Sequence, residues 1–365
     1  MNKFIKINKL LRNINKGTNM KNFGINGFGR IGRTFVRVWL SKNNPNLQLK
    51  VINTSGSMEI EQWAHLLKYD TNYGRFNGDI TVNRTQSKED ITAENPVLGT
   101  ITISGHEVIV TAQRDPKLIP WGQHNVELVV DATGVFTTEE KAAMHFEGGA
   151  KRVLLTAPSK GGNVSTSVIG VNDHNDDNSV FSNASCTTNC VAPVAKIMTT
   201  VFGVEKAMLT TIHSYTDDQN TQDNSHKDLR RARSAAENII PTTTGAAKAT
   251  TEIIPELKGL FDGLAVRVPT PTGSLSDMVF VTKRDVSVEE VNQALIDASN
   301  QDRFKGILAT TNEPIVSSDI VGRSESSIVD LSLTQVIGGN LVKVISWYDN
   351  EWGYCNRLVD QLGLL

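Results

Sequence analysis

The feature that most constrains the fold is a glycine-rich segment near the amino terminus. Gly27-Phe28-Gly29-Arg30-Ile31-Gly32 follows the apolar stretch 22–25 and precedes residues 33–40, where apolar side chains recur at helical spacing. Between a strand and a helix, such glycines permit a tight turn, close approach of backbone to a pyrophosphate, and helix–strand packing. The amino terminus of the helix then presents N–H groups to the phosphates. The motif therefore predicts a strand–loop–helix unit that binds a dinucleotide.

The first half of the chain alternates between strand-like and helix-like segments. Strands are predicted over 48–53, 126–134 and 151–159, a hairpin over 101–111, and a helix over 137–150. This alternation implies an α/β domain whose mostly parallel sheet carries helices on both faces. The strand that ends in Asp131-Ala132-Thr133-Gly134 is expected to face the cofactor crevice, although an ordinary turn would have the same sequence.

The pattern changes near Ser185. A helix is predicted after Cys186, followed by longer strands and the helical segment 287–299. The long strands are predicted over 206–216, 263–271, 276–284 and 341–350. They indicate a second, α+β domain with a mostly antiparallel sheet. The boundaries that we predict are 20–184 for the dinucleotide-binding domain and 185–349 for the second domain.

Length and composition agree with two globular domains and exclude several classes of protein. The chain has 365 residues, a net charge of −2 and three cysteines, none of them in a C-x-x-C pair. The charge gives no electrostatic footprint for nucleic acid, and no apolar run approaches the roughly 18 residues of a membrane span. The cysteines are too few for a disulfide framework, so we expect a reducing compartment, the cytoplasm, and no metal.

Residues 1–19 differ in composition from the rest. They contain five basic residues and no acidic one. A basic leader that is disordered, or an upstream start codon with Met20 as the true start, accounts for them. An organelle-targeting peptide is the alternative, but such peptides favour Arg and Ser, whereas this segment is rich in Lys and Asn.

A candidate nucleophile stands at the start of the second domain. Cys186 is placed where a helix begins, and there the helix dipole lowers the pKa of a thiol, as does a nearby imidazolium. Cys190, one turn further on, is expected to be a small buried side chain. His213 ends a predicted strand among hydroxyl-bearing residues and is a candidate base. Pro193 lies inside the predicted helix and is expected to kink it.

Hydroxyl groups and arginines form candidate anion sites. Ser185 and Thr187 flank Cys186, and further candidates occur in later segments: Thr216, Thr244, Gly245, Arg230, Arg231, Arg233 and Arg267. Hydroxyls, backbone N–H groups and an arginine fork are the groups that recognise phosphate. The arginine cluster 230–233 alternatively forms a solvated face or a subunit contact.

From Met20 to Leu365 the chain resembles the phosphorylating glyceraldehyde-3-phosphate dehydrogenase family. The motifs that carry the resemblance are "NGFGRIGR", "SNASCTTNC", "PTTTGAAKA" and "SWYDNEWGY". The resemblance implies a homotetramer and a Rossmann domain that the carboxyl-terminal helix, 350–365, completes. It implies oxidation of D-glyceraldehyde 3-phosphate to 1,3-bisphosphoglycerate with inorganic phosphate, through a cysteine thioester.

The resemblance also assigns residues to roles. Cys186 matches the nucleophile and His213 the base. Thr216, Asp218 and Arg267 match the site for the substrate's own phosphate; Ser185, Thr187, Arg231, Thr244 and Gly245 match the site for attacking phosphate. Asn350 matches the residue that orients the nicotinamide carboxamide, and Tyr354 and Ile31 match the walls around that ring.

The cofactor site departs from the NAD-specific pattern of the family. Thr54 stands where NAD-using members carry an Asp that accepts from the ribose and repels a 2′-phosphate, and Ser55 beside it can donate a hydrogen bond. Ser225 stands where those members carry Pro, in a loop that reaches a neighbouring subunit's adenosine pocket. Arg114 is the nearest cation. We therefore expect NADP to be accepted and preferred, with NAD also usable.

Other functions remain open at this stage. An erythrose-4-phosphate dehydrogenase-like paralogue would share the Cys, the His and the Rossmann motif, but would be expected to alter the loop "TTTGAAKA". A Cys–His hydrolase would have no use for the glycine motif. A non-catalytic binding protein on the same fold would not need Cys186 and His213 together.

Overall fold

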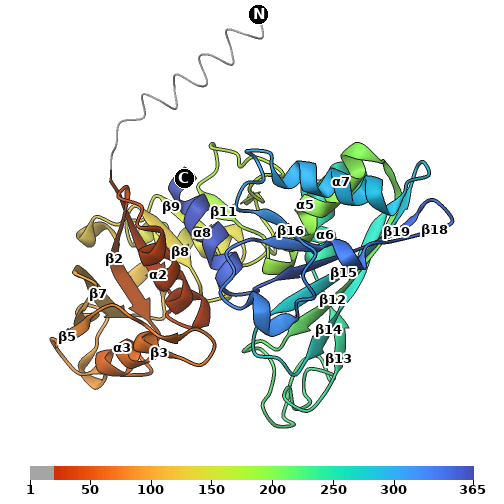
Figure 1. Ribbon diagram of the computed structural model, residues 1–365. Helices are drawn as coiled ribbons and strands as arrows, with labels where there is room; N and C mark the ends of the chain where they lie inside the picture. Colours follow the sequence, from red (N-terminus) through yellow and green to blue (C-terminus); the bar gives the residue numbers. More distant parts are fainter. Residues whose placement is uncertain (1–19) are drawn as a thin grey trace, which may run out of the picture.

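The computed structural model describes residues 20–365, which form two lobes, each built on one large sheet (Figure 1). The interpretations of the basic leader concern residues 1–19, which lie outside this range. Within the described part of the chain, no helix combines the length and the apolar character needed to cross a membrane.

The amino-terminal lobe contains a sheet whose strands run in the order β10-β11-β9-β8-β1-β2-β7-β6-β5. All pairs from β10 to β7 are parallel, and only β6 and β5 are antiparallel to their neighbours. The strands are β1 (Lys21–Asn26), β2 (Leu47–Thr54), β5 (Ile80–Arg84), β6 (Val97–Ile103), β7 (His106–Ala112), β8 (Leu128–Asp131), β9 (Arg152–Leu155), β10 (Ser165–Thr166) and β11 (Val180–Ser182). β3 (Tyr69–Asp70) and β4 (Gly74–Arg75) form a separate hairpin. The predicted mostly parallel sheet is confirmed.

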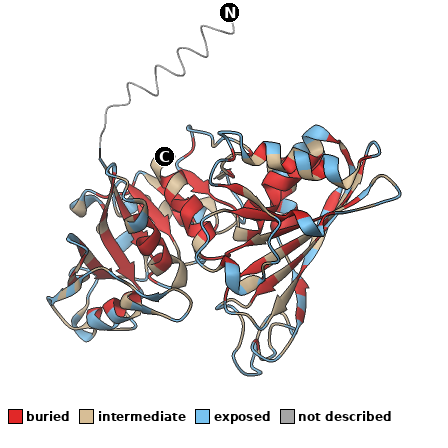
Figure 2. Cartoon of the chain, in the orientation of Figure 1, coloured by how far each residue is buried: buried red, intermediate tan, exposed pale blue. Residues whose placement is uncertain are grey.

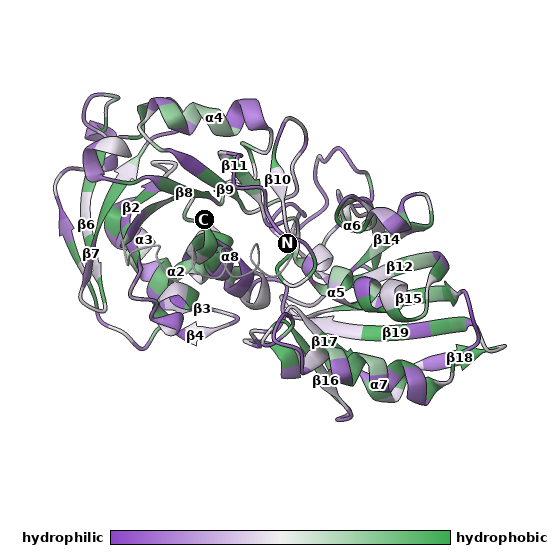
Figure 3. Cartoon of the chain, turned by 90° about the horizontal axis from the view of Figure 1, so that it is seen from above, coloured by the Kyte–Doolittle hydropathy of each residue, from purple (hydrophilic) through white to green (hydrophobic). Residues whose placement is uncertain are grey.

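Helices cover both faces of this sheet. α2 (Arg30–Lys42), α3 (Ile60–Lys68) and α8 (Trp352–Leu364) pack on the face that carries Phe23 and Val130, whereas α4 (Glu139–Glu147) packs on the opposite face with Val129. Neighbouring residues of one strand therefore enter two different cores, as a sheet buried on both sides requires. Figure 3 shows α4 on one side of the sheet and α2 and α8 on the other.

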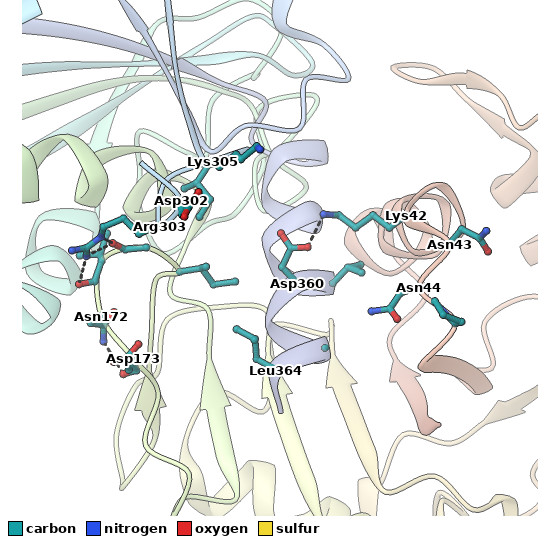
Figure 4. Close-up of a pocket in the computed structure, with 17 residues that line it drawn as sticks. Lys42, Asn43, Asn44, Asn172, Asp173, Asp302, Arg303, Lys305, Asp360 and Leu364 are labelled. Atoms are coloured by element: carbon teal, nitrogen blue, oxygen red, sulfur yellow. Dashed lines mark hydrogen bonds and ion pairs between the residues drawn. The ribbon is translucent and has the colours of Figure 1, made fainter. Parts of the chain in front are cut away.

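The carboxyl-terminal helix α8 belongs to the core of the amino-terminal lobe. Leu358 and Leu362 are fully buried there, beside residues of α2 and β1. Lys42 Nζ forms an ion pair of 2.6 Å with Asp360 Oδ1, which ties the ends of α2 and α8 together (Figure 4). The chain thus crosses between the lobes twice, from β11 into the second lobe and from its last strand back into α8.

The second lobe contains a sheet of order β13-β14-β12-β15-β19-β17-β16, with β18 paired to β19. Most of its pairs are antiparallel, as predicted, and only β12–β14 and β16–β17 are parallel. The strands are β12 (Val204–Ser214), β13 (Ile240–Thr243), β14 (Phe261–Val268), β15 (Ser274–Thr282), β16 (Leu308–Thr311), β17 (Ser327–Asp330), β18 (Gln335–Ile337) and β19 (Leu341–Tyr348).

Three helices bury one face of the second sheet: α5 (Cys186–Val201), α6 (Ala246–Ile253) and α7 (Val288–Ser299). Figure 2 shows the resulting buried layer between α5, α7 and the strands. The sheet also carries exposed apolar side chains, among them Met208 on β12 and Leu264 on β14. α5 is continuous through Pro193, and α2 begins at Arg30, earlier than the predicted residue 33.

Candidate active site

A cleft of about 1090 Å³ lies where the two lobes meet. Half of the predicted site residues line it: Arg30, Ile31, Gly134, Ser185, Cys186, His213, Thr216, Asp218, Arg231, Gly245, Arg267, Asn350 and Tyr354. The other half lies outside its lining: Gly27, Phe28, Gly29, Gly32, Thr54, Ser55, Arg114, Thr133, Thr187, Ser225, Arg230, Arg233 and Thr244. The chain crosses from one lobe to the other beside the cleft, just before Cys186 and just after Asn350. These crossings bring the residues of the first list together at the cleft.

Cys186 is the first residue of α5, and the local sequence fixes this start. Ser185 is the N-cap, and its Oγ accepts a hydrogen bond of 3.1 Å from the Thr188 N–H. A serine in this position satisfies one of the helix's free N–H groups. Cys186 Sγ lies 3.5 Å from His213 Nε2, at the carboxyl end of β12. The predicted nucleophile and base are therefore within contact distance.

His213 Nδ1 lies between an acceptor and a donor. It is 2.7 Å from the Ser214 carbonyl oxygen, which can only accept, and 2.7 Å from Arg267 Nη1, which can only donate, so these contacts are compatible with either tautomer of the neutral imidazole. In the tautomer that carries the hydrogen on Nδ1, Nε2 has a free lone pair toward Cys186. Arg267 Nη1 donates to the same carbonyl at 2.9 Å. Tyr348, which the sequence analysis missed, packs edge-on against the His213 ring, with 6.0 Å between ring centroids.

Burial disfavours a separate charge on either member of the pair. Desolvation raises the pKa of Cys186, against the opposing positive charge of Arg267. Desolvation and the charge of Arg267 lower the pKa of His213 to about 3. Transfer of the proton from thiol to imidazole creates opposite charges in contact, and their attraction offsets the desolvation. Burial raises the pKa of Cys190 to about 11, and its sulfur contacts Ser327 Oγ at 4.0 Å and the Ser346 carbonyl at 3.8 Å, neither of which is a base like His213.

Arginines surround the predicted site for the substrate's phosphate. The Asp218 carboxylate accepts from Thr216 Oγ1 and from Arg231 Nη1. Partial burial opposes ionisation of Asp218, but the hydrogen bond from Thr216 and the charges of Arg267 and Arg231 hold its pKa below the usual range. Arg267 Nε finds no hydrogen-bond partner among the described residues. Nε itself is buried, but Arg267 lines the cleft, so its guanidinium is placed to bind an anion there.

The predicted site for attacking phosphate is only partly assembled around the cleft. Ser185 and Gly245 line it, and Gly245 is the N-cap of α6. Thr244 Oγ1 accepts from the Ala246 N–H at 3.2 Å, next to the cleft. Thr187 does not match the expectation: its side chain is buried, and its hydroxyl is 2.8 Å from Tyr348 OH. The helical turn that exposes Cys186 directs the next side chain into the protein.

The glycine loop has the geometry that its sequence predicts. Gly27 has φ +96°, a conformation that favours glycine, and a Cβ on Gly32 would lie 2.2 Å from the Gly27 carbonyl oxygen. A Cβ on Gly29 would meet nothing within 4 Å, so the backbone is open to a ligand there. α2 begins at this point without a side-chain cap. The loop thus fits the pyrophosphate of a dinucleotide.

The Arg30 side chain, within the glycine motif, is bound to carboxylates of the protein. Its guanidinium is held by Glu351, at 2.5 and 2.6 Å, and by Asp70, at 3.1 and 3.3 Å. The hydrogen bond and charge of Glu351 raise the pKa of Arg30. Burial opposes ionisation of Asp70, but Arg30 outweighs it and lowers that carboxyl's pKa. Arg30 therefore offers the cofactor its backbone, while its side chain joins α2 to the start of α8.

Asn350 is held in one orientation at the same crossing. Its Oδ1 accepts from the Gly273 N–H at 3.1 Å and from Ser274 Oγ at 2.9 Å. Its Nδ2 donors remain for a ligand in the cleft, which suits the carbonyl of a nicotinamide carboxamide. Tyr354 donates to the Ala184 carbonyl at 3.0 Å, which fixes its ring beside Asn350.

The adenosine end of the predicted cofactor site contains no acidic residue at position 54. The Thr54 side chain points inward, where its hydroxyl donates to the Thr111 carbonyl at 3.1 Å. Ser55 is exposed and its Oγ lies 3.0 Å from Ser57 Oγ. β2 and β7 are parallel neighbours, so the exposed Arg114, two residues past β7, emerges beside this loop. Ser225 is exposed in the second lobe.

A second cavity, of about 1130 Å³, lies near the end of α8 and contains none of the predicted site residues (Figure 4). In the range 20–365, no group of three or more His, Cys, Asp or Glu side chains is placed to hold a metal ion.

Comparison with known proteins gives the same family for both lobes. The family model of the glyceraldehyde 3-phosphate dehydrogenase NAD-binding domain matches residues 21–139, and that of the C-terminal domain matches residues 185–350. Glyceraldehyde-3-phosphate dehydrogenase 2 of Synechocystis sp. is 48% identical over 344 residues, 93% of this chain and 97% of that protein.

Other relatives agree. Glyceraldehyde-3-phosphate dehydrogenase of Geobacillus stearothermophilus is 48% identical over 92% of this chain and 96% of its own length. The chloroplastic glyceraldehyde-3-phosphate dehydrogenase A of Chlamydomonas reinhardtii is 45% identical over 92% of this chain and 86% of its own length. Because both family models match and these relatives share almost half of their residues with the chain over nearly its whole length, the chain belongs to the glyceraldehyde-3-phosphate dehydrogenase family.

Proposed function

We propose that the chain catalyses the reversible, NAD(P)-dependent oxidative phosphorylation of D-glyceraldehyde 3-phosphate to 1,3-bisphosphoglycerate. The observation that carries the proposal is the contact of 3.5 Å between Cys186 Sγ and His213 Nε2. The cleft around this pair is lined by Arg231 and Arg267, and by Arg30 and Ile31 of the glycine motif. This pair is the minimum needed to hold an aldehyde covalently while it is oxidised.

Cys186 acts as the nucleophile. His213 Nε2 takes the thiol proton, and the sulfur adds to the aldehyde carbon. The imidazolium then returns the proton to the new alkoxide, which gives a hemithioacetal and a neutral His213. The Cys186 N–H, at the free amino terminus of α5, stabilises the oxygen that becomes negative. Arg267, which reaches the cleft beside His213, binds the substrate's phosphate. This contact fixes the distance between the phosphate and the carbon under attack.

The second half of the reaction uses the same residues. His213 removes the proton of the hemithioacetal hydroxyl, and loss of hydride leaves a thioester on Cys186. When bound, the nicotinamide dinucleotide supplies the hydride acceptor, beside Asn350 and Tyr354. Inorganic phosphate, held by Ser185, Thr244, Gly245 and Arg231, attacks the thioester carbonyl and releases the thiolate. The product is the acyl phosphate.

We also propose that the active molecule is a homotetramer. Met208 on β12 and Leu264 on the neighbouring strand β14 are 64% and 45% exposed. Leu229, in the segment between β12 and β13, is 81% exposed, and Ile239, directly before β13, is 71% exposed. Apolar side chains gathered in this way are typical of subunit interfaces.

The cofactor assay tests the function. Purified protein with glyceraldehyde 3-phosphate is expected to reduce the nicotinamide cofactor only when inorganic phosphate or arsenate is present. Cys186→Ser should abolish this reduction, because a hydroxyl near neutral pH is a far weaker nucleophile than a thiolate. Cys190→Ser is the matched control and should keep most of the activity. Reduction that is independent of phosphate, or faster with erythrose 4-phosphate, would favour the paralogous activity.

Removal of His213 should expose the effect of burial on Cys186. In His213→Asn, no neighbouring base accepts the thiol proton, and the pKa of Cys186 stays above its usual range. Alkylation by iodoacetamide at pH 7 is expected to slow by about tenfold or more, the equivalent of one pKa unit, and to rise with pH through the alkaline range. The rate is measured by mass spectrometry of the Cys186 peptide. A pH profile identical to that of the wild type would contradict the proposed role of His213.

Arg267 should contribute to kcat/KM mainly when the aldehyde substrate carries a phosphate. Arg267→Ala removes a charge-assisted hydrogen-bond donor, so roughly 1.5–3 kcal/mol, or about one to two orders of magnitude in kcat/KM, should be lost for glyceraldehyde 3-phosphate. Unphosphorylated glyceraldehyde should lose much less. Equal losses for both substrates would make Arg267 a structural residue.

For the cofactor, we propose that NADP is accepted and preferred, with NAD also usable. The support is local. No carboxylate stands at Thr54 to repel a 2′-phosphate, Ser55 exposes a donor, and Arg114 emerges beside the same loop. Ser225 in a neighbouring subunit would supply a further donor.

The double variant Thr54→Asp with Ser225→Pro should reverse this preference. It restores a negative charge and removes a donor, so the ratio of kcat/KM for NADP over NAD is expected to fall by about tenfold or more, equivalent to roughly 1.4 kcal/mol. Steady-state kinetics with both cofactors measures the ratio. A wild-type protein that uses NAD well and ignores NADP would overturn the proposal.

A further inference from the structure

A buried polar network crosses the amino-terminal sheet directly beneath the cofactor loops. It begins at His145 on α4, whose side chain is fully buried. It continues through Asp131 at the end of β8, Asn26 at the end of β1 and Asn53 near the end of β2, and ends at Thr111 on β7. Each of these side chains is at most 3% exposed. The proposed chemistry uses none of them.

The contact with Trp121 fixes which ring nitrogen of His145 carries the hydrogen. Trp121 Nε1, which can only donate, lies 3.1 Å from His145 Nδ1, so Nδ1 must accept. His145 is therefore the neutral tautomer that carries its hydrogen on Nε2, and Nε2 donates to Asp131 Oδ2 at 3.0 Å. An imidazolium would place two N–H groups against each other at Nδ1. The histidine thus serves as a fixed donor and not as a proton carrier.

The Asp131 carboxylate links His145 to both cofactor loops, because it accepts hydrogen bonds from residues of each loop. Its Oδ2 also accepts from Asn26 Nδ2 at 2.8 Å, next to Gly27. Its Oδ1 accepts from the Thr133 N–H at 3.1 Å and from Thr133 Oγ1 at 2.6 Å, which shapes the turn before Gly134. The two loops touch, because a Cβ on Gly27 would lie 3.0 Å from Thr133 N. One carboxylate therefore holds both.

The other end of the network, at Asn53 and Thr111, lies beside the segments proposed to bind the adenosine ribose of the cofactor. Asn53 Nδ2 donates to Asn26 Oδ1 and to the Gln113 carbonyl, both at 2.8 Å. Asn53 Oδ1 accepts from Thr111 Oγ1 at 2.9 Å and from the Gln113 N–H at 3.0 Å. Gln113 precedes Arg114, and Asn53 precedes Thr54. The same chain of hydrogen bonds thus fixes the pyrophosphate loop and both segments proposed to meet the ribose.

We infer that His145, acting through Asp131, is a positioning residue for the cofactor: it sets the affinity for the nicotinamide dinucleotide without touching it. The inference rests on the proposed function, since it assumes that the glycine loop binds a dinucleotide. Loss of one donor leaves a buried carboxylate underbonded, and the Asn26 and Thr133 groups must then move to compensate. Such movement shifts the loops that the cofactor contacts, while Arg267 and Cys186 in the second lobe keep their places.

The test compares variants of the full-length protein by calorimetric titration with NADH and NADPH. His145→Leu removes the donor, and the Kd for the dinucleotides is expected to rise by about tenfold, the loss expected for a hydrogen bond to a charged group. His145→Gln places an amide N–H and a carbonyl at the spacing of the two ring nitrogens, and should return the Kd to within about threefold of the wild type. The KM for glyceraldehyde 3-phosphate, measured at saturating cofactor, should change less than about twofold.

Two further variants separate positioning from general stability. Phe146→Leu shortens the next side chain of α4, which packs in the apolar core outside the network, and should lower the melting temperature without changing the Kd. Thr111→Val removes the donor at the far end without changing side-chain shape, and should raise the Kd even if His145→Leu fails to fold. An unchanged Kd in His145→Leu and Thr111→Val, or an equal rise in Phe146→Leu, would overturn the inference. A wild-type protein that binds neither dinucleotide would instead overturn the proposed function.

Discussion

The ion pair between Arg30 and Glu351 is the interaction on which the geometry of the site depends. It joins residues 321 positions apart, one at the start of α2 and one just before α8. Asn350 precedes Glu351, and Gly27 and Gly29 precede Arg30. The pair therefore fixes, relative to each other, the two segments that we propose to hold the nicotinamide and the pyrophosphate. Asp70 contributes a second carboxylate to the same guanidinium. Breaking a partly buried pair leaves a charge without its partner, which costs more than the pair contributes.

Much of the fold and of the site could be predicted from the sequence, because the responsible signals are local. The glycine motif requires a strand before it and a helix after it, and Gly27 and Gly32 have the close contacts that exclude a Cβ. Ser185 before Cys186 is a helix-start signal, and the structure places the thiol there. The alternation of strands and helices was sufficient for the parallel sheet.

Side-chain direction could not be predicted in the same way. Thr187 and Thr54 were expected at ligand sites from their positions in motifs, yet both hydroxyls are bonded within the protein, to Tyr348 and to the Thr111 carbonyl. Arg30 is occupied by carboxylates that lie 40 and 321 positions away in the chain. The His145–Asp131 pair has no sequence signature, since it depends on α4 packing against β8. Contacts of this kind follow from tertiary packing, which no local pattern contains.

The placement of charge explains how one cleft can serve several anions. Three carboxylates near the ligands are already bonded: Asp218 to Arg231 and Thr216, Glu351 to Arg30, and Asp131 to its four donors. None of them has to be desolvated anew when a phosphate arrives. The groups left for the ligands are donors, namely the Arg267 guanidinium, the amino termini of α2 and α5, and Asn350 Nδ2. Burial disfavours the charged form of both Cys186 and His213 when only one of them is charged. Transfer of a proton from the thiol to the imidazole is therefore the favourable route to a thiolate. The pair therefore supplies a thiolate by transfer of the proton from Cys186 to His213, and not by loss of the proton to solvent.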